Sequence, residues 1–382
     1  MFYKTLSVII KKLYKRTSDS MNNFFILFSL FVLVSCSHQN ISRPSLTETT
    51  NFKIDNNGWP IQGEINFAPT SSTAVLFIHG SGIHDRYQTI PAMLTTTNKD
   101  EPFFKELRDR LNQKGISTIL FDKRAYPADK SDEATLKSAT FENLKGDVIK
   151  VIQYIKQTNK IKKLILLGHS EGTVIASEIS FQMKNDPFIS KLVLISPLAT
   201  NLKDSLHEQM TFGMSRNVFI EADQNKDGKI YPEEVPPHMI KTLPFDKLDP
   251  YKRGYITQSD LLQVLEKQFK SLIDFISKDQ QNTLIMNKPS SWYKEFMNRP
   301  TLLERAQDYS IPVVLIQGKI DPQTPFQINA LPLSNRLRFF KKKVQLIALP
   351  DLGHGLSKMK ENLPTLGPMA PEALEEIIKT IP

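Results

Sequence analysis

Short runs of apolar residues recur along the chain, and longer stretches of mixed polarity separate them. Runs of about five apolar residues between polar or turn-forming positions are typical of strands that are buried on both faces of a sheet. The pattern predicts such strands at residues 74–78, 117–121, 163–167, 191–195, 313–317 and 344–349.

Between most of these runs, apolar residues recur at spacings of three and four, which is the periodicity of one helical face. The predicted helices cover residues 103–111, 144–155, 174–183 and 371–378, and Pro371 opens the last of them. Because strands that alternate with helices indicate βαβ units, the fold class is α/β with a mostly parallel, doubly wound sheet.

The alternation of strands and helices stops between residues 200 and 305, where no clear core strand occurs. A chain of 382 residues is long enough for one large domain with an insertion. We therefore predict a core that consists of residues 52–199 and 306–382, interrupted by an insertion at residues 200–305.

The first 51 residues follow a different pattern. An apolar run at Phe24–Val34 is shorter than the ~20 residues that span a bilayer, and basic residues precede it. Residues 1–35 hold five basic residues and one acidic residue, so this segment carries +4 of the formal net charge of +9. These features predict a secretory signal peptide at residues 1–35. A start at Met21 would leave the apolar run without its basic segment.

The apolar run ends in Leu33-Val34-Ser35-Cys36, which resembles the lipobox of bacterial lipoproteins. Cys36 is the only cysteine, so it has no partner for an internal disulfide. The resemblance implies that Cys36 is lipidated, that residues 36–51 are a polar tether, and that the protein is an exported, membrane-anchored lipoprotein of the bacterial cell envelope. The alternative is an unprocessed signal anchor with an incidental cysteine.

Composition and charge argue against several other classes of protein. Hydrophobic residues make up 40% and charged residues 23% of the chain, which is typical of globular proteins and not of collagen, coiled coils or disordered chains. Beyond the first 35 residues the net charge is about +5, and the one basic block is Lys341–Lys343. This dilute charge does not indicate a nucleic-acid partner.

A candidate nucleophile lies where a predicted strand meets a predicted helix. Gly168-His169-Ser170-Glu171-Gly172 matches G-x-S-x-G, in which the glycines allow a sharp strand-to-helix turn that exposes the serine hydroxyl. Ser170 is therefore the candidate nucleophile. His354 follows the last predicted strand in a glycine-flanked loop and is the candidate base, because the other downstream histidines, His207 and His238, belong to the insertion.

The candidate acid follows the preceding predicted strand. Asp321, in the sequence VVLIQGKIDPQTP, lies where a carboxylate can orient the imidazole of His354 and stabilise the imidazolium. Asp351 lies three residues before His354 on the same loop and is the weaker alternative.

A candidate oxyanion hole lies at the end of the first predicted strand. His79-Gly80-Ser81 matches the H-G motif whose backbone N–H groups stabilise an oxyanion. We expect the backbone N–H groups of Ser81 and Glu171 to form this hole. We expect His79 and His169 to be hydrogen-bonded histidines near the end of the sheet.

Taken in order, these motifs resemble those of the α/β-hydrolase superfamily, over about residues 52–200 and 306–382. FDKRAYP at 121–127 looks like the "YDxRG" turn of this superfamily, with Ala125 in place of the glycine. The resemblance implies a serine hydrolase that forms an acyl-enzyme intermediate with a small-molecule or lipid carboxylic ester and needs no organic cofactor. A serine peptidase of the same fold and a catalytically retired, calcium-dependent binding protein stay open as alternatives. The oligomeric state is not predicted.

The insertion contains a candidate calcium site. ADQNKDGKIYPEE matches the EF-hand pattern, with side-chain oxygens expected from Asp223, Asn225 and Asp227, a backbone carbonyl from Lys229 and a bidentate carboxylate from Glu234. Oxygen atoms are the ligands that calcium prefers, and the sequence therefore predicts one structural calcium ion at residues 223–234.

A degenerate copy follows at residues 249–260, with Tyr251 and Arg253 where ligands belong. Arg253 would place a cation in this loop, so no metal is expected there. The loops could pair through Ile230 and Ile256, although their short spacing and Pro236–Pro237 argue against standard pairing. The resemblance to α/β-hydrolases also implies that the insertion is a helical cap over the nucleophile, which calcium would stabilise.

Overall fold

The computed structural model describes residues 48–69, 71–237, 239, 245–249, 251–359 and 366–381. These residues form two compact units, and we call them the core (Glu48–Leu202 with Glu295–Ile381) and the insertion (Lys203–Lys294). The predicted signal peptide, Cys36 and nearly all of the predicted tether lie outside the described residues. Within the described ranges, no helix is both long enough and apolar enough to cross a membrane.

The core is built on an eight-stranded sheet. Its strand order is β1-β2-β6-β3-β7-β8-β13-β14, and only the pairings β1–β2 and β2–β6 are antiparallel. This arrangement confirms the predicted α/β-hydrolase fold with a mostly parallel sheet. The strands are β1 (Glu48–Asn56), β2 (Trp59–Phe67), β3 (Thr73–Ile78), β6 (Ser117–Phe121), β7 (Lys163–His169), β8 (Ile189–Ile195), β13 (Val313–Gly318) and β14 (Val344–Leu349).

Apolar runs in the sequence predicted six of these strands but not the hairpin of β1 and β2. β1 lies at the edge of the sheet, so its side chains alternate between exposed and less exposed positions and do not form an apolar run. Asn57 and Gly58 connect the two strands, and both have positive φ angles of 53° and 81°. An Asn-Gly pair with these angles is a strong signal for a two-residue hairpin.

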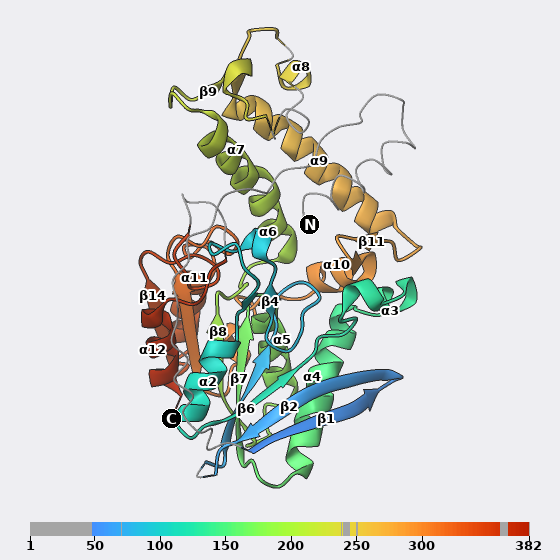
Figure 1. Cartoon of the computed structure of the whole chain (residues 1–382), viewed down its shortest axis with the longest axis vertical. Coiled ribbons are helices and arrows are strands. Elements are labelled where there is room, and N and C mark those ends of the chain that lie inside the picture. Colours follow the sequence, from blue (N-terminus) through green and yellow to red (C-terminus); the bar gives the residue numbers. More distant parts are fainter. Residues whose placement is uncertain are drawn as a thin grey trace. The chain divides into compact units, whose positions relative to one another are not determined.

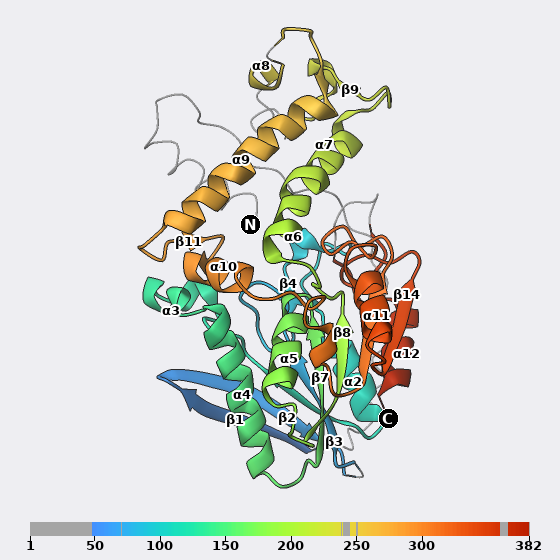
Figure 2. The ribbon, with the colours of Figure 1, turned by 180° about the vertical axis from the view of Figure 1, so that it is seen from behind.

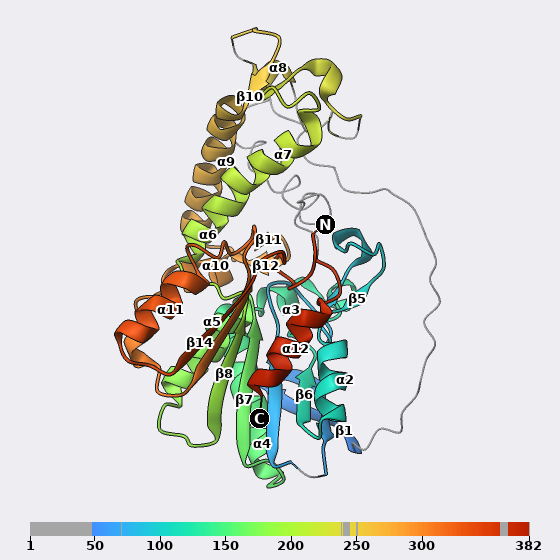
Figure 3. The ribbon, with the colours of Figure 1, turned by 90° about the vertical axis from the view of Figure 1, so that its left-hand side faces the viewer.

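Helices cover both faces of the sheet. α2 (Lys105–Gln113) and α12 (Pro371–Thr380) lie on one face, whereas α4 (Phe141–Gln157), α5 (Glu171–Gln182) and α11 (Ala330–Phe339) lie on the other (Figure 3). Figure 2 views the molecule from the side of α4 and α5. Four of these helices were predicted, and α11 was not. The shorter elements of the core are β4 (Thr89–Ile90), β5 (Glu101–Pro102), α3 (Glu133–Lys137), and the 3₁₀ helices η1 (Ala92–Leu94), η2 (Ala128–Lys130) and η5 (Ala306–Asp308).

The insertion consists mainly of helices (Figure 1). The long helix α9 contacts α7 and buries one face, formed by Leu261, Leu265, Phe269, Leu272 and Ile276. The elements in chain order are α6 (Leu202–Glu208), the π-helix η3 (Gln209–Gly213), α7 (Met214–Ala222), β9 (Lys229–Ile230), η4 (Pro232–Glu234), α8 (Phe245–Leu248), β10 (Ile256–Thr257), α9 (Gln258–Lys278), β11 (Leu284–Ile285), β12 (Lys288–Pro289) and α10 (Ser290–Met297).

The two EF-hand-like loops of the insertion pair through short strands. β9 and β10 are antiparallel, with Ile230 opposite Ile256, and both isoleucines are fully buried. The expected pairing through these residues is therefore present despite the short spacing of the loops. Burial of the two isoleucines links the conformation of one loop to that of the other.

Candidate active site

Ser170 occupies a sharp turn between β7 and α5. Its φ angle is 53° and its ψ angle is −118°, a strained conformation for a residue other than glycine. The turn brings backbone atoms together so closely that a Cβ atom on Gly168 would lie 2.3 Å from the Gly172 carbonyl oxygen. A Cβ atom on Gly172 would lie 2.2 Å from the Ile78 carbonyl oxygen. The glycines of the motif are therefore required by the close approach of backbone to backbone.

His354 and Asp321 lie together at the carboxyl ends of β14 and β13. The distance between His354 Nδ1 and Asp321 Oδ2 is 2.9 Å, and both residues are buried. Because Asp321 accepts from Nδ1–H, the lone pair of the imidazole is on Nε2, where a general base needs it. Among the described residues, Ser170 Oγ makes no hydrogen bond to the His354 ring, and such bonds are often long in ligand-free enzymes.

Asp321 is held in place by Thr324. The Thr324 hydroxyl donates to Asp321 Oδ2 (2.7 Å), and the backbone N–H groups of Gln323 and Thr324 donate to Oδ1 (2.8 and 3.0 Å). Burial would raise the pKa of Asp321, but the charge and hydrogen bond of His354 together with the Thr324 bonds lower the pKa below its usual range. Asp351, the weaker alternative, is exposed.

His169 and Ser196 support the His354 loop. Ser196, directly after β8, donates to the His354 carbonyl oxygen (2.7 Å). The His169 ring hydrogen-bonds the same carbonyl through Nε2 (3.3 Å) and accepts from the Gln88 amide at Nδ1 (2.8 Å). Burial, and next the nearby charge of His354, lower the pKa of His169 well below its ordinary value, so His169 stays neutral.

His79 differs from His169. Its ring packs edge-on against Phe121, and its Nε2 atom is buried with no hydrogen-bond partner among the residues described. We expected both histidines to be hydrogen-bonded. Both ring nitrogens of His169 are, whereas Nε2 of His79 is not. Burial, and next the charge of Lys123, lower the pKa of His79 well below its ordinary value. The neutral ring serves aromatic packing.

The predicted oxyanion-hole segments lie beside the nucleophile. A Cβ atom on Gly80 would lie 3.3 Å from Ser170 Cβ, which places the peptide between Gly80 and Ser81 next to Ser170. Glu171, at the start of α5, is buried. Lys123 connects the two segments, because its Nζ atom donates to the Gly80 carbonyl oxygen (2.5 Å) and to Glu171 Oε2 (2.8 Å).

Ala125 occupies the position where the "YDxRG" turn has glycine. Its φ angle is 67°, and its side chain is fully buried. The left-handed conformation that glycine favours is therefore kept, and alanine is accommodated with backbone strain. The neighbouring Arg124 uses this turn to reach Asp147, which it contacts through Nε at 2.8 Å.

The predicted calcium ligands lie on one loop, and backbone N–H groups hold their oxygens. Asp223 accepts from the N–H groups of Asp227 (3.1 Å) and Gly228 (3.0 Å), and Glu234 reaches across the loop to those of Asn225 (3.3 Å) and Tyr231 (3.0 Å). The hard oxygen donors fit calcium. However, no three His, Cys, Asp or Glu side chains within the described ranges converge closely enough to hold a metal ion.

The second loop contains its own cation. The Arg253 guanidinium contacts Asp260 through a terminal nitrogen, and its Nε lies 3.6 Å from Asp249 Oδ1. Asp249 and Asp260 are the first and last positions of this loop. The guanidinium thus bridges the two carboxylates that would bind a metal ion in an intact EF-hand, as the sequence predicts.

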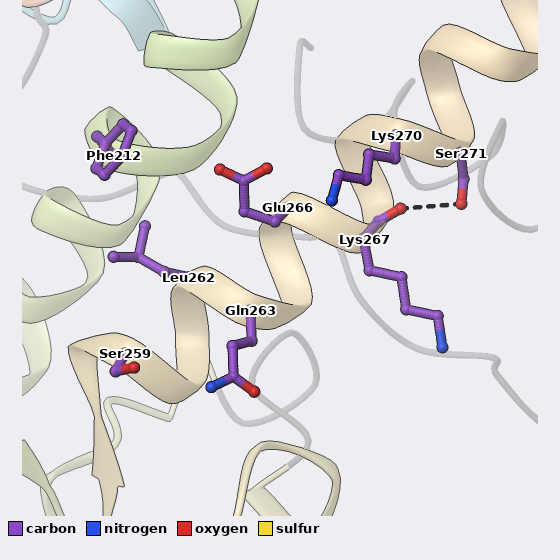
Figure 4. A pocket seen from close by; sticks show the side chains of 8 residues that line it. All are labelled: Phe212, Ser259, Leu262, Gln263, Glu266, Lys267, Lys270 and Ser271. Atoms are coloured by element: carbon purple, nitrogen blue, oxygen red, sulfur yellow. Dashed lines mark hydrogen bonds between the residues drawn. The ribbon is translucent and has the colours of Figure 1, made fainter.

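A pocket of about 600 Å³ lies within the insertion (Figure 4). Phe212, which is 44% exposed, faces it from η3, and α9 supplies the rest of its wall. Met210 and Met214, on either side of Phe212, are buried instead. The lining residues are Phe212, Ser259, Leu262, Gln263, Glu266, Lys267, Lys270 and Ser271.

Sequence reasoning missed several residues around Ser170, His354 and Asp321. Thr324 follows Asp321 by three residues, a spacing at which a hydroxyl and a carboxylate commonly bond within a turn. Gln88 and Ser196 carry no local signal, because the fold alone brings them to His169 and His354. Lys123 was within a recognised motif but had no assigned role.

Known proteins that resemble this chain include several esterases. Esterase EstD of Thermotoga maritima is 29% identical over 168 residues, which cover 43% of this chain and only 37% of that protein. The structure of Est1E from Butyrivibrio proteoclasticus with ferulic acid bound is 15% identical, covers 86% of this chain and 95% of that chain, and has a TM-score of 0.47. Brefeldin A esterase, a bacterial homologue of human hormone-sensitive lipase, is 13% identical and has a TM-score of 0.49. The match covers 91% of this chain and 78% of that chain.

One family matches over more than half of the chain. The model of the family described as serine aminopeptidase, S33, matches residues 98–357. The match includes Ser170, Asp321 and His354 together with the whole insertion. The chain therefore belongs to the serine aminopeptidase S33 family of serine hydrolases.

Proposed function

We propose that the protein hydrolyses a carboxylic ester through Ser170, His354 and Asp321. The observation that carries this proposal is the 2.9 Å contact between His354 Nδ1 and Asp321 Oδ2, beside a serine in a strained turn. His354 Nε2 takes the hydroxyl proton of Ser170 as its oxygen attacks the carbonyl carbon. The N–H groups of Ser81 and Glu171 stabilise the oxyanion, and the alcohol leaves with the proton from His354. Water then repeats the sequence and releases the acid.

A serine peptidase of the same fold is the second candidate, and the description of the family favours it. An aminopeptidase needs an acidic group to bind the substrate ammonium. Glu171, the acidic residue next to the nucleophile, is buried and paired with Lys123 instead. That pairing and the name of the partial relative EstD support an ester substrate.

Substrate profiling tests the proposal. The purified protein should hydrolyse p-nitrophenyl esters of graded chain length faster than aminoacyl p-nitroanilides. The opposite preference would establish the peptidase. A fluorophosphonate probe should label the protein if it is an esterase or a serine peptidase. A catalytically retired, calcium-dependent binding protein would stay unlabelled.

We further propose that the insertion binds one calcium ion through Asp223, Asn225, Asp227, the Lys229 carbonyl and Glu234, and that it acts as a cap. The chain enters the insertion shortly after the carboxyl end of β8, where Ser196 supports the His354 loop, and this origin supports a role in substrate access. Calcium would stabilise the loop pair joined by Ile230 and Ile256. Calorimetry that detects no calcium binding would overturn this proposal.

Lipid anchoring through Cys36 is a separate proposal, and it rests on the lipobox-like sequence that ends at Cys36. It implies that the protein is exported and tethered in the bacterial cell envelope. Cys36→Ser should prevent acylation and release the protein from the membrane fraction. Fractionation and mass spectrometry measure both effects, and unchanged membrane retention of the variant would contradict the proposal.

A further inference from the structure

Lys123 is a buried cation with no role in the reaction described so far. It follows β6 and is 4% exposed. Its Nζ atom donates to the Gly80 carbonyl oxygen at 2.5 Å and to Glu171 Oε2 at 2.8 Å. These two acceptors belong to the two segments that supply the proposed oxyanion hole, one after β3 and one at the start of α5.

The bond to Gly80 determines the direction of a neighbouring N–H group. The Gly80 carbonyl and the Ser81 N–H belong to one planar peptide, and the one cis peptide among the described residues is Tyr126–Pro127. In a trans peptide the C=O and N–H bonds point in opposite directions. An ammonium that holds the Gly80 oxygen therefore directs the Ser81 N–H away from Lys123.

The preceding peptide, between His79 and Gly80, is held as well. The Gly80 N–H donates to the Gln88 side-chain oxygen (2.6 Å), and Gln88 also donates to His169, which precedes the nucleophile (2.8 Å). Both backbone polar groups of Gly80 are thus hydrogen-bonded. A Cβ atom on Gly80 would lie 3.3 Å from Ser170 Cβ, so this residue is close to the nucleophile. Rotation of the Gly80–Ser81 peptide would break the bond from Lys123, and the bond from Gly80 N–H to Gln88 fixes the backbone just before it.

Stability alone gives little reason for a buried Lys–Glu pair, because desolvation offsets much of the attraction and an apolar pair of similar size is often as stable. The geometry of the two acceptors supplies a reason. One ammonium holds the peptide that carries the Ser81 N–H and also the side chain of Glu171, the residue that supplies the second N–H. This common contact preorganises the two segments for the charge that develops in the transition state.

We propose that Lys123 is a positioning residue that aligns the oxyanion hole through Gly80 and Glu171. This inference rests on the proposed hydrolytic function. Because the hole acts mainly in the transition state, misalignment should lower kcat and leave KM nearly unchanged.

The test compares two double variants, each of which replaces both partners of one buried ion pair with apolar residues. The cations of the two pairs, Lys123 and Arg124, are neighbours in the chain. The double variant Lys123→Met/Glu171→Leu removes the pair without leaving an unpaired charge, and we expect kcat to fall about 10- to 100-fold with KM within about twofold. The affinity for a boronic acid, which forms a tetrahedral adduct with the serine, should fall in parallel. The matched control Arg124→Met/Asp147→Leu removes the neighbouring buried pair, which contacts no oxyanion segment, and kcat should stay within about twofold.

Melting curves of both double variants separate positioning from folding. A Lys123/Glu171 variant that melts like the wild type and keeps the wild-type kcat would overturn the inference, as would a change confined to KM. Lys123→Arg, which keeps the cation, should retain more activity than Lys123→Met. A wild type with no hydrolytic activity would instead contradict the proposed function itself.

A second inference comes from the corner between α11 and β14. Residues 336–343 hold five cations, Arg336, Arg338 and Lys341–Lys343, and no acidic residue occurs between 322 and 350. Phe339, at the end of α11, is 72% exposed. None of the five cations makes an ion pair with a described carboxylate.

We infer that this corner binds the surface of an anionic membrane. Clustered cations attract anionic headgroups, and an exposed aromatic ring inserts at the interface. The corner adjoins the first residue of β14, whereas His354 follows its last residue, so the two lie about 20 Å apart along the strand. A bilayer bound at this corner would leave the catalytic edge of the sheet facing away from it.

Vesicle sedimentation tests this inference with the purified full chain. Vesicles with 30% phosphatidylglycerol should bind at least about tenfold more tightly than vesicles of phosphatidylcholine alone, and salt should weaken the binding. Lys341→Gln/Lys342→Gln/Lys343→Gln should remove this preference, while the matched control Lys114→Gln/Lys150→Gln/Lys184→Gln, at scattered exposed positions, should keep it. Equal binding of the wild type to both vesicles would overturn the inference, and so would binding to heparin without binding to vesicles.

Discussion

Three buried acidic residues of the core and the acidic residues of one loop of the insertion have different partners. In the core, Glu171 pairs with Lys123 and Asp147 pairs with Arg124, while Asp321 accepts a hydrogen bond from His354. In the loop at residues 223–234, the carboxylates accept hydrogen bonds from backbone N–H groups and from the Tyr231 hydroxyl, and among the described residues they form no ion pair. Glu171 and Asp147 therefore have counter-charges from the chain itself, whereas Asp223, Asp227 and Glu234 have none among the described residues.

In the degenerate loop at residues 249–260, a side chain of the loop itself supplies the positive charge. Arg253 bridges Asp249 and Asp260 in the position that a metal ion would take. Burial would raise the pKa of Asp260, but bonds from Thr257 and Arg253 outweigh it and lower the pKa. One loop of the pair thus contains an arginine that pairs with its carboxylates, whereas the carboxylates of the other loop form no ion pair among the described residues.

Removal of the nucleophile should have the largest effect. Ser170→Ala should lower kcat for ester hydrolysis by at least about 10⁴-fold, because no other group replaces the attacking oxygen. The free energy of unfolding should stay within about 0.5 kcal/mol, since a small hydroxyl is lost. Turnover of a p-nitrophenyl ester and urea unfolding measure the two quantities. Undiminished turnover would disprove the role of Ser170. By contrast, Glu234→Gln in the insertion should leave Ser170 reactive toward a small fluorophosphonate.

Asp321→Asn should lower kcat about 10³- to 10⁴-fold, because an amide no longer selects the imidazole tautomer with its lone pair on Nε2. Since the pKa of Asp321 is lowered in the folded state, its ionised form stabilises the wild type above the ordinary carboxyl pKa of about 4. This stabilisation is lost as the pH falls through the lower, folded-state pKa. Unfolding at pH 3 to 7 should show the wild type and the variant converging at the acidic end, and a constant difference would contradict the assignment.

The buried pair of Arg124 and Asp147 should contribute more to stability than the loop pair of Arg253 and Asp260. Asp147→Asn leaves a buried guanidinium without its counter-charge and should cost about 3–5 kcal/mol. Asp260→Asn should cost clearly less, because the Arg253 side chain is 30% exposed and water screens its charge. Urea unfolding measures both variants, and equal losses would contradict the contrast between the two regions.

Calcium should stabilise the insertion without being required by the core. At a hundredfold excess over Kd, a metal ion that binds only the folded state stabilises it by about 2.7 kcal/mol. Chelation should therefore lower the melting temperature of the wild type, and Glu234→Gln should remove the response to calcium. Calorimetry checks this, with Glu233→Gln, beside the ligand position, as the control that should still respond.

The smallest predicted effect concerns pH and the buried His169. Its pKa is lowered in the folded state, so the unfolded chain binds a proton below pH 6.5 that the folded chain does not. Stability should fall as the pH drops below about 6.5, by at most about 1.4 kcal/mol per pH unit for this residue. His169→Gln should flatten this slope in urea titrations between pH 5 and 7. An unchanged slope would show that another group causes it.

Local patterns determined much of this protein from the sequence alone. Six of the eight strands of the core sheet, four helices and the turn at Ser170 follow from the repeat of apolar residues and from glycines that backbone contacts require. The EF-hand spacing likewise predicted that Ile230 and Ile256 could pair and that Arg253 would enter the second loop. Most of these features depend on residues within about ten positions of one another, so spacing alone reports them. Ile230 and Ile256 are farther apart, and their pairing was predicted because the EF-hand pattern occurs twice.

Only the tertiary structure decided which distant groups meet. The strand order brings Asp321, and not the exposed Asp351, to His354, and it brings Lys123 to both Gly80 and Glu171. The strand order also leaves β1 at an edge of the sheet, where many of its side chains are exposed. Polar residues occupy these exposed positions, so β1 lacks the apolar run that marks a buried strand. The partner of a long polar side chain depends on crossover connections and sheet register, and neither is encoded in the local repeat of hydrophobic residues.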